Sequence, residues 1–312
     1  MKREQLKPIL DAIAGVHTAS LEAPGLEFSA LRRVRDQLLI AAQASEGDWR
    51  KYLFALDSFV TELSFAQSLE ELPSPAFSIF REDGNSKLPF LAFSALAGRD
   101  FCPGSGPCLE WCYSFRAWRY PAAFCRQAQN SLLLCTELGR ELILRELDRI
   151  LARPKFRAMD SVDFRLYVDG DFRDVNDIHF WMETLRERPQ LATYGYSKSF
   201  LELLGYGVAL EAQGLAWPSN YLLNLSDGHR HAPATIAAME RLPITRGRFV
   251  AVTMGRKVKS SDHGNREHQA ELRARYGRQA FTCPGKCGEC TPKGHACGSE
   301  RFRGVDVIIA VH

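Results

Sequence analysis

The chain has 312 residues, of which 46% are hydrophobic and 25% are charged, and its formal net charge at pH 7 is +3. No apolar run reaches the roughly 20 residues that a membrane helix needs, which excludes a membrane-spanning protein. The N-terminal stretch MKREQLKPILDAIAG lacks the long apolar core of a signal peptide, so we expect a cytoplasmic protein without membrane contact.

Apolar residues at helical spacing mark the first part of the chain. Leu31, Val34 and Leu38 fall on one stripe, and a second stripe runs through DWRKYLFALDSFVTEL. The break ASEGD between them predicts a turn, with Asp48 as the N-cap of the next helix. Because PSPAF then interrupts the pattern, we expect a helical subdomain over 1–75. Its wide apolar stripes must pack against the rest of the chain or bind a protein partner.

Strand and helix patterns alternate over the remaining domain, 76–312. Seven segments are typical of strands: LPFLAFSALAG, VDFRLYVDGD, LATYGYSKS, NYLLNLSDG, GRFVAVTMG, QAFTCPG and GVDVIIAVH. Helical patterns lie between most of them, including a long helix from about Pro121 to Ala152 and another capped by Asp174. This alternation predicts parallel strands that are joined by right-handed crossovers.

Two α/β architectures satisfy this alternation, an open doubly wound sheet and a (β/α) barrel. The Gly-rich phosphate-binding fingerprint of a dinucleotide fold is absent after the first strand. Polar residues instead gather at the ends of strands, where barrel enzymes build their sites. We therefore predict an α/β fold, a partial (β/α) barrel of about six to seven mostly parallel strands that follows the N-terminal helical subdomain.

Nine cysteines are present, and most of them are clustered. In a reducing compartment, clustered thiols more often bind metal than form disulfides. Cys102, Cys108 and Cys112 follow the first predicted barrel strand with the spacing C-x5-C-x3-C, and the intervening PGSGP should leave backbone N–H groups free to face an anionic centre. Three thiolates on one loop suit a [4Fe–4S] cluster with one open iron, or three ligands of a zinc ion. Cys125 and Cys135 fall in a predicted helix and are expected in the core.

A second cysteine group lies in CPGKCGECTPKGHACG near the C-terminus. Its members are Cys283, Cys287, Cys290 and Cys297. Four thiols can complete a site by themselves, as a second iron–sulfur cluster or as a structural tetrahedral zinc site. His295 is an alternative ligand. The two cysteine groups could also share one site, if the strands that carry them are neighbours in a nearly closed barrel.

The cysteine loop and several strand-end motifs resemble known families. The position of the loop after the first barrel strand, and Trp111 just before Cys112, are similar to the cluster loop of radical S-adenosylmethionine enzymes, whose usual spacing is C-x3-C-x2-C. More closely, CPGSGPCLEWCYSFRAWRYPAA, RLYVDGDF, YGYSKS and NLSDG resemble the phage and plasmid gene product 88 domain family over about residues 80–312. This resemblance implies a radical S-adenosylmethionine-like iron–sulfur protein of a mobile element, with an undefined substrate.

Polar residues at the ends of strands are further site candidates, and for the first two the similarity to radical S-adenosylmethionine enzymes implies a role. Asp169 and Asp171 would accept hydrogen bonds from the ammonium of S-adenosylmethionine. Lys198 would bind a carboxylate or phosphate as a point charge. The loop SDGHRH after another strand is a further candidate for binding metal or substrate.

Basic residues concentrate between Glu240 and Arg303, where 14 Lys and Arg stand against 6 Asp and Glu. Such a segment can bind nucleic acid, and aromatic residues of the first cysteine loop could stack on bases. The alternative hypothesis is therefore a non-enzymatic metal-binding protein, iron–sulfur or zinc, that binds nucleic acid or has a regulatory role.

Overall fold

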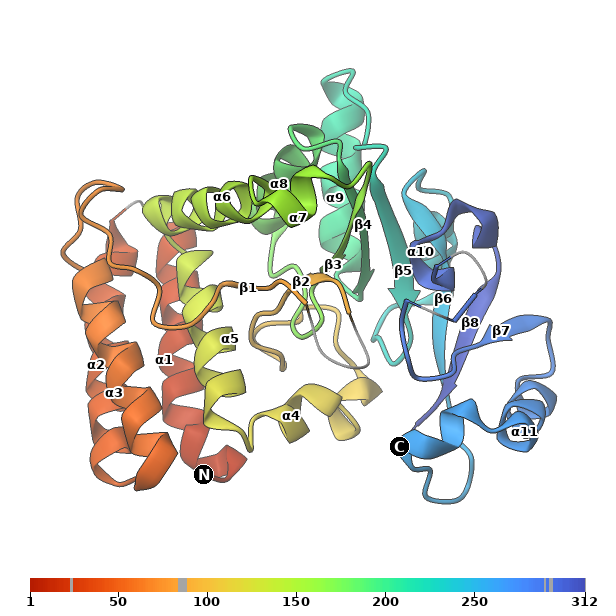
Figure 1. Cartoon of the computed structure of the whole chain (residues 1–312), viewed down its shortest axis with the longest axis horizontal. Helices are drawn as coiled ribbons and strands as arrows, with labels where there is room; N and C mark the ends of the chain where they lie inside the picture. The colour runs from red at the N-terminus through yellow and green to blue at the C-terminus, as the bar shows by residue number, and fades with distance from the viewer. Residues whose placement is uncertain (23–24, 84–88, 289, 292–293, 312) are drawn as a thin grey trace. The chain divides into compact units, whose positions relative to one another are not determined.

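The structure is a computed structural model of the chain and describes residues 1–22, 25–83, 89–288, 290–291 and 294–311 (Figure 1). Its internal contacts divide the chain into two compact units. The helical unit consists of Met1–Phe80, Phe93–Phe101 and Tyr113–Ala158, and the sheet unit of Arg81–Ala92, Cys102–Cys112 and Met159–His312. The helical unit thus continues a few residues beyond the subdomain expected over 1–75, and it also includes two later segments of the chain.

The helical unit is built from helices packed side by side. They are α1 (Arg3–Glu22), α2 (Leu26–Gln43), α3 (Gly47–Leu63), α4 (Tyr113–Ala117), α5 (Pro121–Leu133), α6 (Glu137–Leu151) and α7 (Pro154–Arg157). α2 packs against both α1 and α3, and α5 also packs against α1 and α3 (Figure 1). Leu31, Val34 and Leu38 are all buried, as their spacing indicates. The predicted cap is wrong, because α3 begins at Gly47 and Asp48 lies inside its first turn.

The long helix predicted from Pro121 to Ala152 is in fact two helices, α5 and α6. The side chain of Thr136 accepts a hydrogen bond from the N–H of Gly139 at 3.0 Å and so caps α6. Gly139 has no room for a side chain, since a Cβ there would lie 2.3 Å from the carbonyl oxygen of Leu133. Apolar residues continue through this break, so the periodicity alone does not reveal it.

Buried amide side chains give the motif RQAQNS, residues 126–131 of α5, a structural role. Gln129 accepts a hydrogen bond from the N–H of Phe77 at 2.9 Å and donates one to its carbonyl oxygen at 2.7 Å. Asn130 donates to the carbonyl oxygens of Ile79 and Ser94, both at 2.9 Å. These bonds satisfy backbone groups that would otherwise be buried without partners. The motif therefore fixes two backbone segments of the helical unit against α5.

The sheet unit is an α/β structure. The strands are β1 (Phe80–Arg81), β2 (Leu91–Phe93), β3 (Val162–Leu166), β4 (Leu191–Ser197), β5 (Tyr221–Ser226), β6 (Thr245–Val252), β7 (Ala280–Thr282) and β8 (Asp306–Ala310). They form one eight-stranded sheet in the order β1-β2-β3-β4-β5-β6-β8-β7. The helices that join successive strands are α8 (Val175–Arg186), α9 (Phe200–Ala212) and α10 (Pro233–Glu240), and α11 (Arg266–Tyr276) precedes β7.

Every strand pairing from β2 to β7 is parallel. The predicted α/β fold with mostly parallel strands and a helical N-terminal region is therefore confirmed, and the short β1 is an eighth strand that the sequence did not predict. Consecutive strands are neighbours from β1 to β6, as in a (β/α) barrel, whereas a doubly wound sheet reverses its order at a switch point. Asp174 caps α8 as predicted, because its side chain accepts a hydrogen bond from the N–H of Asp177 at 2.8 Å.

The two faces of the sheet have different partners. On one face, Phe164 of β3 packs against Trp181 of α8, with ring centroids 6.1 Å apart. On the other face, Tyr194 of β4 belongs to one buried cluster with Ala296 and Cys297. The cysteine-rich segment after β7 therefore covers the face that lines the interior of a barrel.

Candidate metal centres

The first cysteine loop, Cys102–Cys112, lies against the loop that follows β5. The carbonyl oxygen of Gly228 accepts hydrogen bonds from the N–H groups of Gly106 and Cys108, both at 3.1 Å. The loop follows β2, and β2 to β5 are parallel neighbours, so their carboxyl ends share one edge of the sheet. The three thiols therefore lie at the edge where barrel enzymes place their sites.

Close backbone contact explains the glycines of this region. A Cβ at Gly104 would lie 1.6 Å from the carbonyl oxygen of Lys198, and one at Gly228, where φ is 74°, would lie 2.7 Å from the Cβ of Cys108. The expectation of free N–H groups is wrong for much of the loop, because those of Ser105 and Cys108, among others, donate to backbone carbonyls. The glycines allow tight docking and do not form an anion-binding nest.

Cys108 is the buried thiol of the first cysteine loop, whereas Cys102 and Cys112 are half-buried. Burial raises the pKa of Cys108, and the ammonium of Lys198 partly opposes that rise. Cys112 and Asp171 are also near enough to act on this thiol. The structure thus brings Cys108 together with two of the residues that the sequence singled out at strand ends.

Asp171 ties the loop after β3 to the end of β4. Its carboxylate is 4% exposed and accepts hydrogen bonds from Ser197 Oγ at 2.6 Å, from the N–H of Lys198 at 2.7 Å and from the N–H of Phe172 at 2.9 Å. Burial raises the pKa of Asp171, and the bond from Ser197 is the strongest opposing influence. The half-buried Lys198 donates from Nζ to Ser226 Oγ at 2.8 Å. We call Asp169, Asp171, Lys198 and Ser226 the strand-end site.

Asp169 lies in the same turn as Asp171 and is half-buried. Just before this turn, Tyr167 has a φ of 54°, in the left-handed region that residues with a side chain rarely adopt. Its ring is buried, and its hydroxyl accepts a hydrogen bond from Trp181 Nε1 at 3.2 Å. Strained backbone clusters at functional sites. Tyr167 is therefore an addition to the candidate site, and no feature of the sequence pattern signals a positive φ there.

Two histidines of the SDGHRH loop support the strand ends. His231 Nε2 lies 2.7 Å from the carbonyl oxygen of Lys198 and must donate to it, and His229 Nδ1 accepts from the N–H of His231 at 3.1 Å. Both rings pack on Phe200, with centroid distances of 5.0 and 4.8 Å. Burial lowers the pKa of His229, and the neighbouring His231 and Lys198 lower it further. These contacts orient the loop against Lys198.

The C-terminal cysteines, Cys283, Cys287, Cys290 and Cys297, come together on the sheet face opposite α8. Three of them pack on the buried cluster around Tyr194, and Cys283 is within electrostatic range of the other three. Burial raises the pKa of Cys283 to about 12 and that of Cys297 to about 11. These thiols are therefore protonated at neutral pH unless a metal ion displaces the protons.

Backbone donors are directed at these sulfur atoms, which fits a metal centre. The N–H of Gly285 lies 3.4 Å from Cys283 Sγ, and that of Ala296 lies 3.4 Å from Cys290 Sγ. Such bonds stabilise thiolate ligands and tune the metal that they hold. Among the described residues, no three His, Cys, Asp or Glu side chains are gathered closely enough to hold one ion. Metal binding would therefore require the cysteine sulfur atoms to move closer together.

The remaining predicted ligands have other surroundings. The Nδ1 of His295 accepts from the N–H of Gly298 at 3.1 Å, and its Nε2 lies 3.3 Å from Asp163 Oδ1, so both ring nitrogens already have contacts. Cys125 and Cys135 are buried in the helical unit. The first cysteine loop lies at strand ends and the C-terminal cysteines on a sheet face, which favours two separate sites over a shared one.

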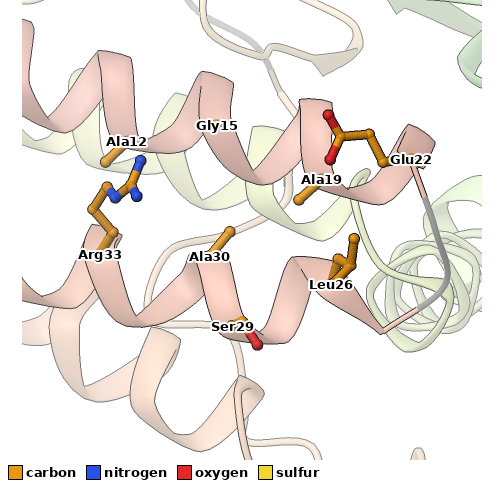
Figure 2. A pocket seen from close by; sticks show the side chains of 8 residues that line it. All are labelled: Ala12, Gly15, Ala19, Glu22, Leu26, Ser29, Ala30 and Arg33. Carbon is orange, nitrogen blue, oxygen red and sulfur yellow. The ribbon is translucent and has the colours of Figure 1, made fainter.

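A shallow groove runs between α1 and α2 in the helical unit (Figure 2). Ala12, Gly15 and Ala30 are among its small lining residues, and Glu22 and Arg33 lie toward its opposite ends. Small side chains leave room for another chain to approach. The protein partner expected from the N-terminal helices stays a prediction.

The fold and the two thiol groups define an α/β protein with a barrel-like parallel sheet and two cysteine-rich candidate sites. A family model described as Gene product 88 matches residues 68–305. Because the match covers more than half of the chain, the protein belongs to the gene product 88 family, and the family predicted from the sequence motifs is confirmed. Searches of curated proteins and of solved structures found no match. In the described part of the chain, no helix has the length and apolar character needed to span a membrane.

Proposed function

We propose that this protein is an iron–sulfur enzyme of the radical S-adenosylmethionine type, with one [4Fe–4S] cluster held by Cys102, Cys108 and Cys112. The observation that carries the proposal is the docking of this loop at the strand ends, where Cys108 lies beside Lys198 and Asp171. Three thiolates leave one iron without a protein ligand. When bound, such a cluster supplies an electron and a binding position for the amino-acid part of S-adenosylmethionine.

Residues of the strand-end site suit that amino-acid group. Its carboxylate needs a cation, and Lys198 is a half-buried one held in place by Ser226. Its ammonium needs oxygen acceptors. We assign this role to Asp169 and Asp171, the two carboxylates of the turn after β3. The oxygens of Asp171 also accept three hydrogen bonds within the protein, and through them Asp171 fixes the backbone of Lys198.

We propose that the C-terminal cysteines hold a second metal centre, either a [4Fe–4S] cluster or a zinc ion. Four thiols complete either kind of centre without a further ligand. Because the unfolded chain has no preformed site, the free energy of metal binding adds to the free energy of folding. This centre would hold the segment after β7 on the sheet face.

Iron and sulfide analysis after anaerobic reconstitution tests both centres. Two cubane clusters correspond to about eight iron atoms per chain. Changing Cys102, Cys108 and Cys112 together to Ala should remove about half of this iron, because one of two equal clusters loses its ligands. The matched control is Cys135→Ala, a buried cysteine of the helical unit, which should leave the iron content unchanged. The same iron content in the triple variant as in the wild type would contradict the assignment.

A second candidate function is a non-enzymatic metal-binding protein that binds nucleic acid. The observation in its favour is the four-thiol group, which needs no substrate to complete it. Several arginines of the basic segment 240–303 already have partners, since Arg248 pairs with Glu240 at 2.5 Å and Arg256 with Glu271 at 3.0 Å. A colourless zinc protein whose affinity for DNA or RNA falls steeply with salt would favour this candidate over the enzyme.

A further inference from the structure

Arg246 on β6 is an arginine with no exposed surface. Its Nε donates to Asn224 Oδ1 at 2.8 Å, its Nη1 to the carbonyl oxygens of Phe302, at 3.0 Å, and Val305, and its Nη2 to that of Arg248 at 3.1 Å. All of these acceptors are neutral, and Arg246 makes no ion pair with any residue that the structure describes. A buried ion is costly unless an opposite charge offsets it, so this guanidinium calls for an anion nearby.

The C-terminal cysteines can supply this anion once a metal ion has displaced their protons, in addition to the carboxylate of Asp306, which also acts on Arg246. Asn224 links Arg246 to Cys297, because its Oδ1 accepts a hydrogen bond from Arg246 while its Nδ2 donates one to the carbonyl oxygen of Cys297 at 2.9 Å. Burial lowers the pKa of Arg246, and Cys297 is the strongest influence that raises it, ahead of Tyr196 and Asp306. The guanidinium and the thiols therefore lie within electrostatic range on the same face of the sheet.

Tyr196 extends this arrangement on β4. Its side chain packs against the buried cluster that contains Cys297, and its hydroxyl is close enough to act on the sulfur of that cysteine. The guanidinium of Arg165 lies 4.7 Å from the centre of the Tyr196 ring and also acts on Cys297. The cations Arg246 and Arg165 and the hydroxyl of Tyr196 thus all act on Cys297 from the strands beneath it. This environment suits a centre that carries negative charge.

We propose that Arg246 is the counter-charge of the centre held by Cys283, Cys287, Cys290 and Cys297, an inference that rests on the proposed function of these cysteines. Four thiolates around a zinc ion or a [4Fe–4S] cluster leave about two negative charges on the site. Burying that charge alone is as unfavourable as burying a guanidinium alone. The negative charge of the metal centre and the positive charge of Arg246 lie on one sheet face and offset each other. Arg246 therefore stabilises the metal-bound form over the metal-free one.

Titration with Co(II) under anaerobic conditions tests this proposal in the full chain. Co(II) bound by thiolates absorbs in the near ultraviolet, and the C-terminal site is the part of this absorption that Cys287→Ser removes. Competition with a chelator gives the Kd. Arg246→Met, which removes the charge, should weaken Co(II) binding by about 10- to 100-fold, the usual effect of losing a residue that supports metal ligands. The rise in Tm on adding Co(II) should shrink in the same variant.

Matched variants separate charge from hydrogen bonding. Arg246→Lys keeps the charge but cannot make all four hydrogen bonds, and it should bind Co(II) within about threefold of the wild type, well short of the loss expected on removing the residue. Arg248→Met changes an arginine of the same strand that pairs with Glu240, and it should bind as the wild type does. If Arg246→Met loses its native circular dichroism spectrum, Arg246→Gln takes its place with the same expected loss.

Two results would overturn the inference: an unchanged Kd in Arg246→Met, or an equal loss in Arg246→Lys and Arg246→Met. The second result would make Arg246 a clamp for the carbonyls of Phe302 and Val305 and nothing more. A failure of the proposed function looks different, because the wild type would then show no thiolate absorption that Cys287→Ser removes.

Discussion

The burial of the Asp171 carboxylate is the main unfavourable electrostatic contribution in the strand-end site. A fully buried carboxylate is tolerated there because three donors from Ser197, Lys198 and Phe172 converge on it. Burial still outweighs those bonds, and the pKa of Asp171 is raised from its ordinary value of 3.8. The residue thus fixes the backbone of Lys198 at some expense of stability, as is common where a site demands a particular geometry.

The pH dependence of stability should reveal this cost. A carboxyl group whose pKa is higher in the folded than in the unfolded chain binds more protons when folded. The protonated carboxyl therefore favours the folded state at low pH, and this contribution to the free energy of unfolding is lost as the pH rises through the raised pKa. Relative to Asp171→Asn, the wild type should lose free energy of unfolding above about pH 4, by about 1.4 kcal/mol for each unit by which the pKa is raised.

Urea unfolding over a series of pH values measures this difference. Asp160→Asn, a change at an exposed carboxylate, is the control and should show no such trend. A difference between the wild type and Asp171→Asn that stays constant with pH would show that the carboxyl is not perturbed in the folded protein.

Single residues differ in how far the sequence predicts their role. Asp171 and Lys198 stand out because polar residues at the end of an apolar strand are unusual, and the structure brings both to Cys108. Arg246 does not stand out, since an arginine in a strand usually faces solvent. Its burial depends on Asn224 of β5 and on carbonyls near residues 302–305, which are distant in the sequence.

At the level of elements, α3 illustrates how the helical unit is held together. α3 packs against α2 and α5, and its Leu56 is fully buried, whereas Phe54 on the same helix is 40% exposed. Leu56→Ala should lower the free energy of unfolding by about 2–5 kcal/mol, because it removes buried methyl groups and leaves a cavity. Phe54→Ala should change it by only about 0.5 kcal/mol.

Urea unfolding of both variants checks this expectation. Equal, small effects would mean that α3 is loosely attached and that the N-terminal helices form a separable subdomain over 1–75. A large effect confined to Leu56→Ala, in a single cooperative transition, would mean that they share one core with α5.

Element types were more predictable than element ends. Short apolar runs located β2 to β8, because parallel strands that are buried on both faces need apolar residues along their length. The break between α5 and α6 was missed because it depends on the Thr136 cap and on the tight contact at Gly139, not on a loss of apolar residues. The two-residue β1 is too short to show any period.

At the scale of the whole molecule, the sequence predicted mostly parallel strands, but neither the insertion of β8 between β6 and β7 nor the segment that covers the sheet. The segment after β7 was expected as a metal-binding C-terminus, and the structure lays it over the face that carries Tyr194 and Tyr196. Such a placement depends on contacts between residues about a hundred positions apart, which local patterns do not record. The same holds for the joining of Tyr113–Ala158 to the N-terminal helices.

The sheet topology leads to the last prediction, which concerns the reaction. Because β2 to β5 are parallel and adjacent, the first cysteine loop, Asp169 and Lys198 all lie at one edge of the sheet. If the cluster proposed there has an open iron, the reduced protein should cleave S-adenosylmethionine. One electron from dithionite breaks the bond between sulfur and C5′, which yields methionine and a 5′-deoxyadenosyl radical. That radical takes a hydrogen atom from a donor and becomes 5′-deoxyadenosine, which chromatography detects.

Variants of the strand-end site should affect this cleavage in distinct ways. Cys108→Ala should abolish it, because the cluster loses a ligand. Lys198→Met should raise the KM for S-adenosylmethionine by about tenfold or more, since a charge-assisted hydrogen bond is worth about 1.5–3 kcal/mol and each 1.4 kcal/mol is tenfold in binding. Lys257→Met, at an exposed lysine, is the control and should leave the KM unchanged. If the iron-loaded wild type makes no 5′-deoxyadenosine and its EPR spectrum does not respond to S-adenosylmethionine, the cluster is closed by a further protein ligand. The strand-end site would then serve a redox or structural centre.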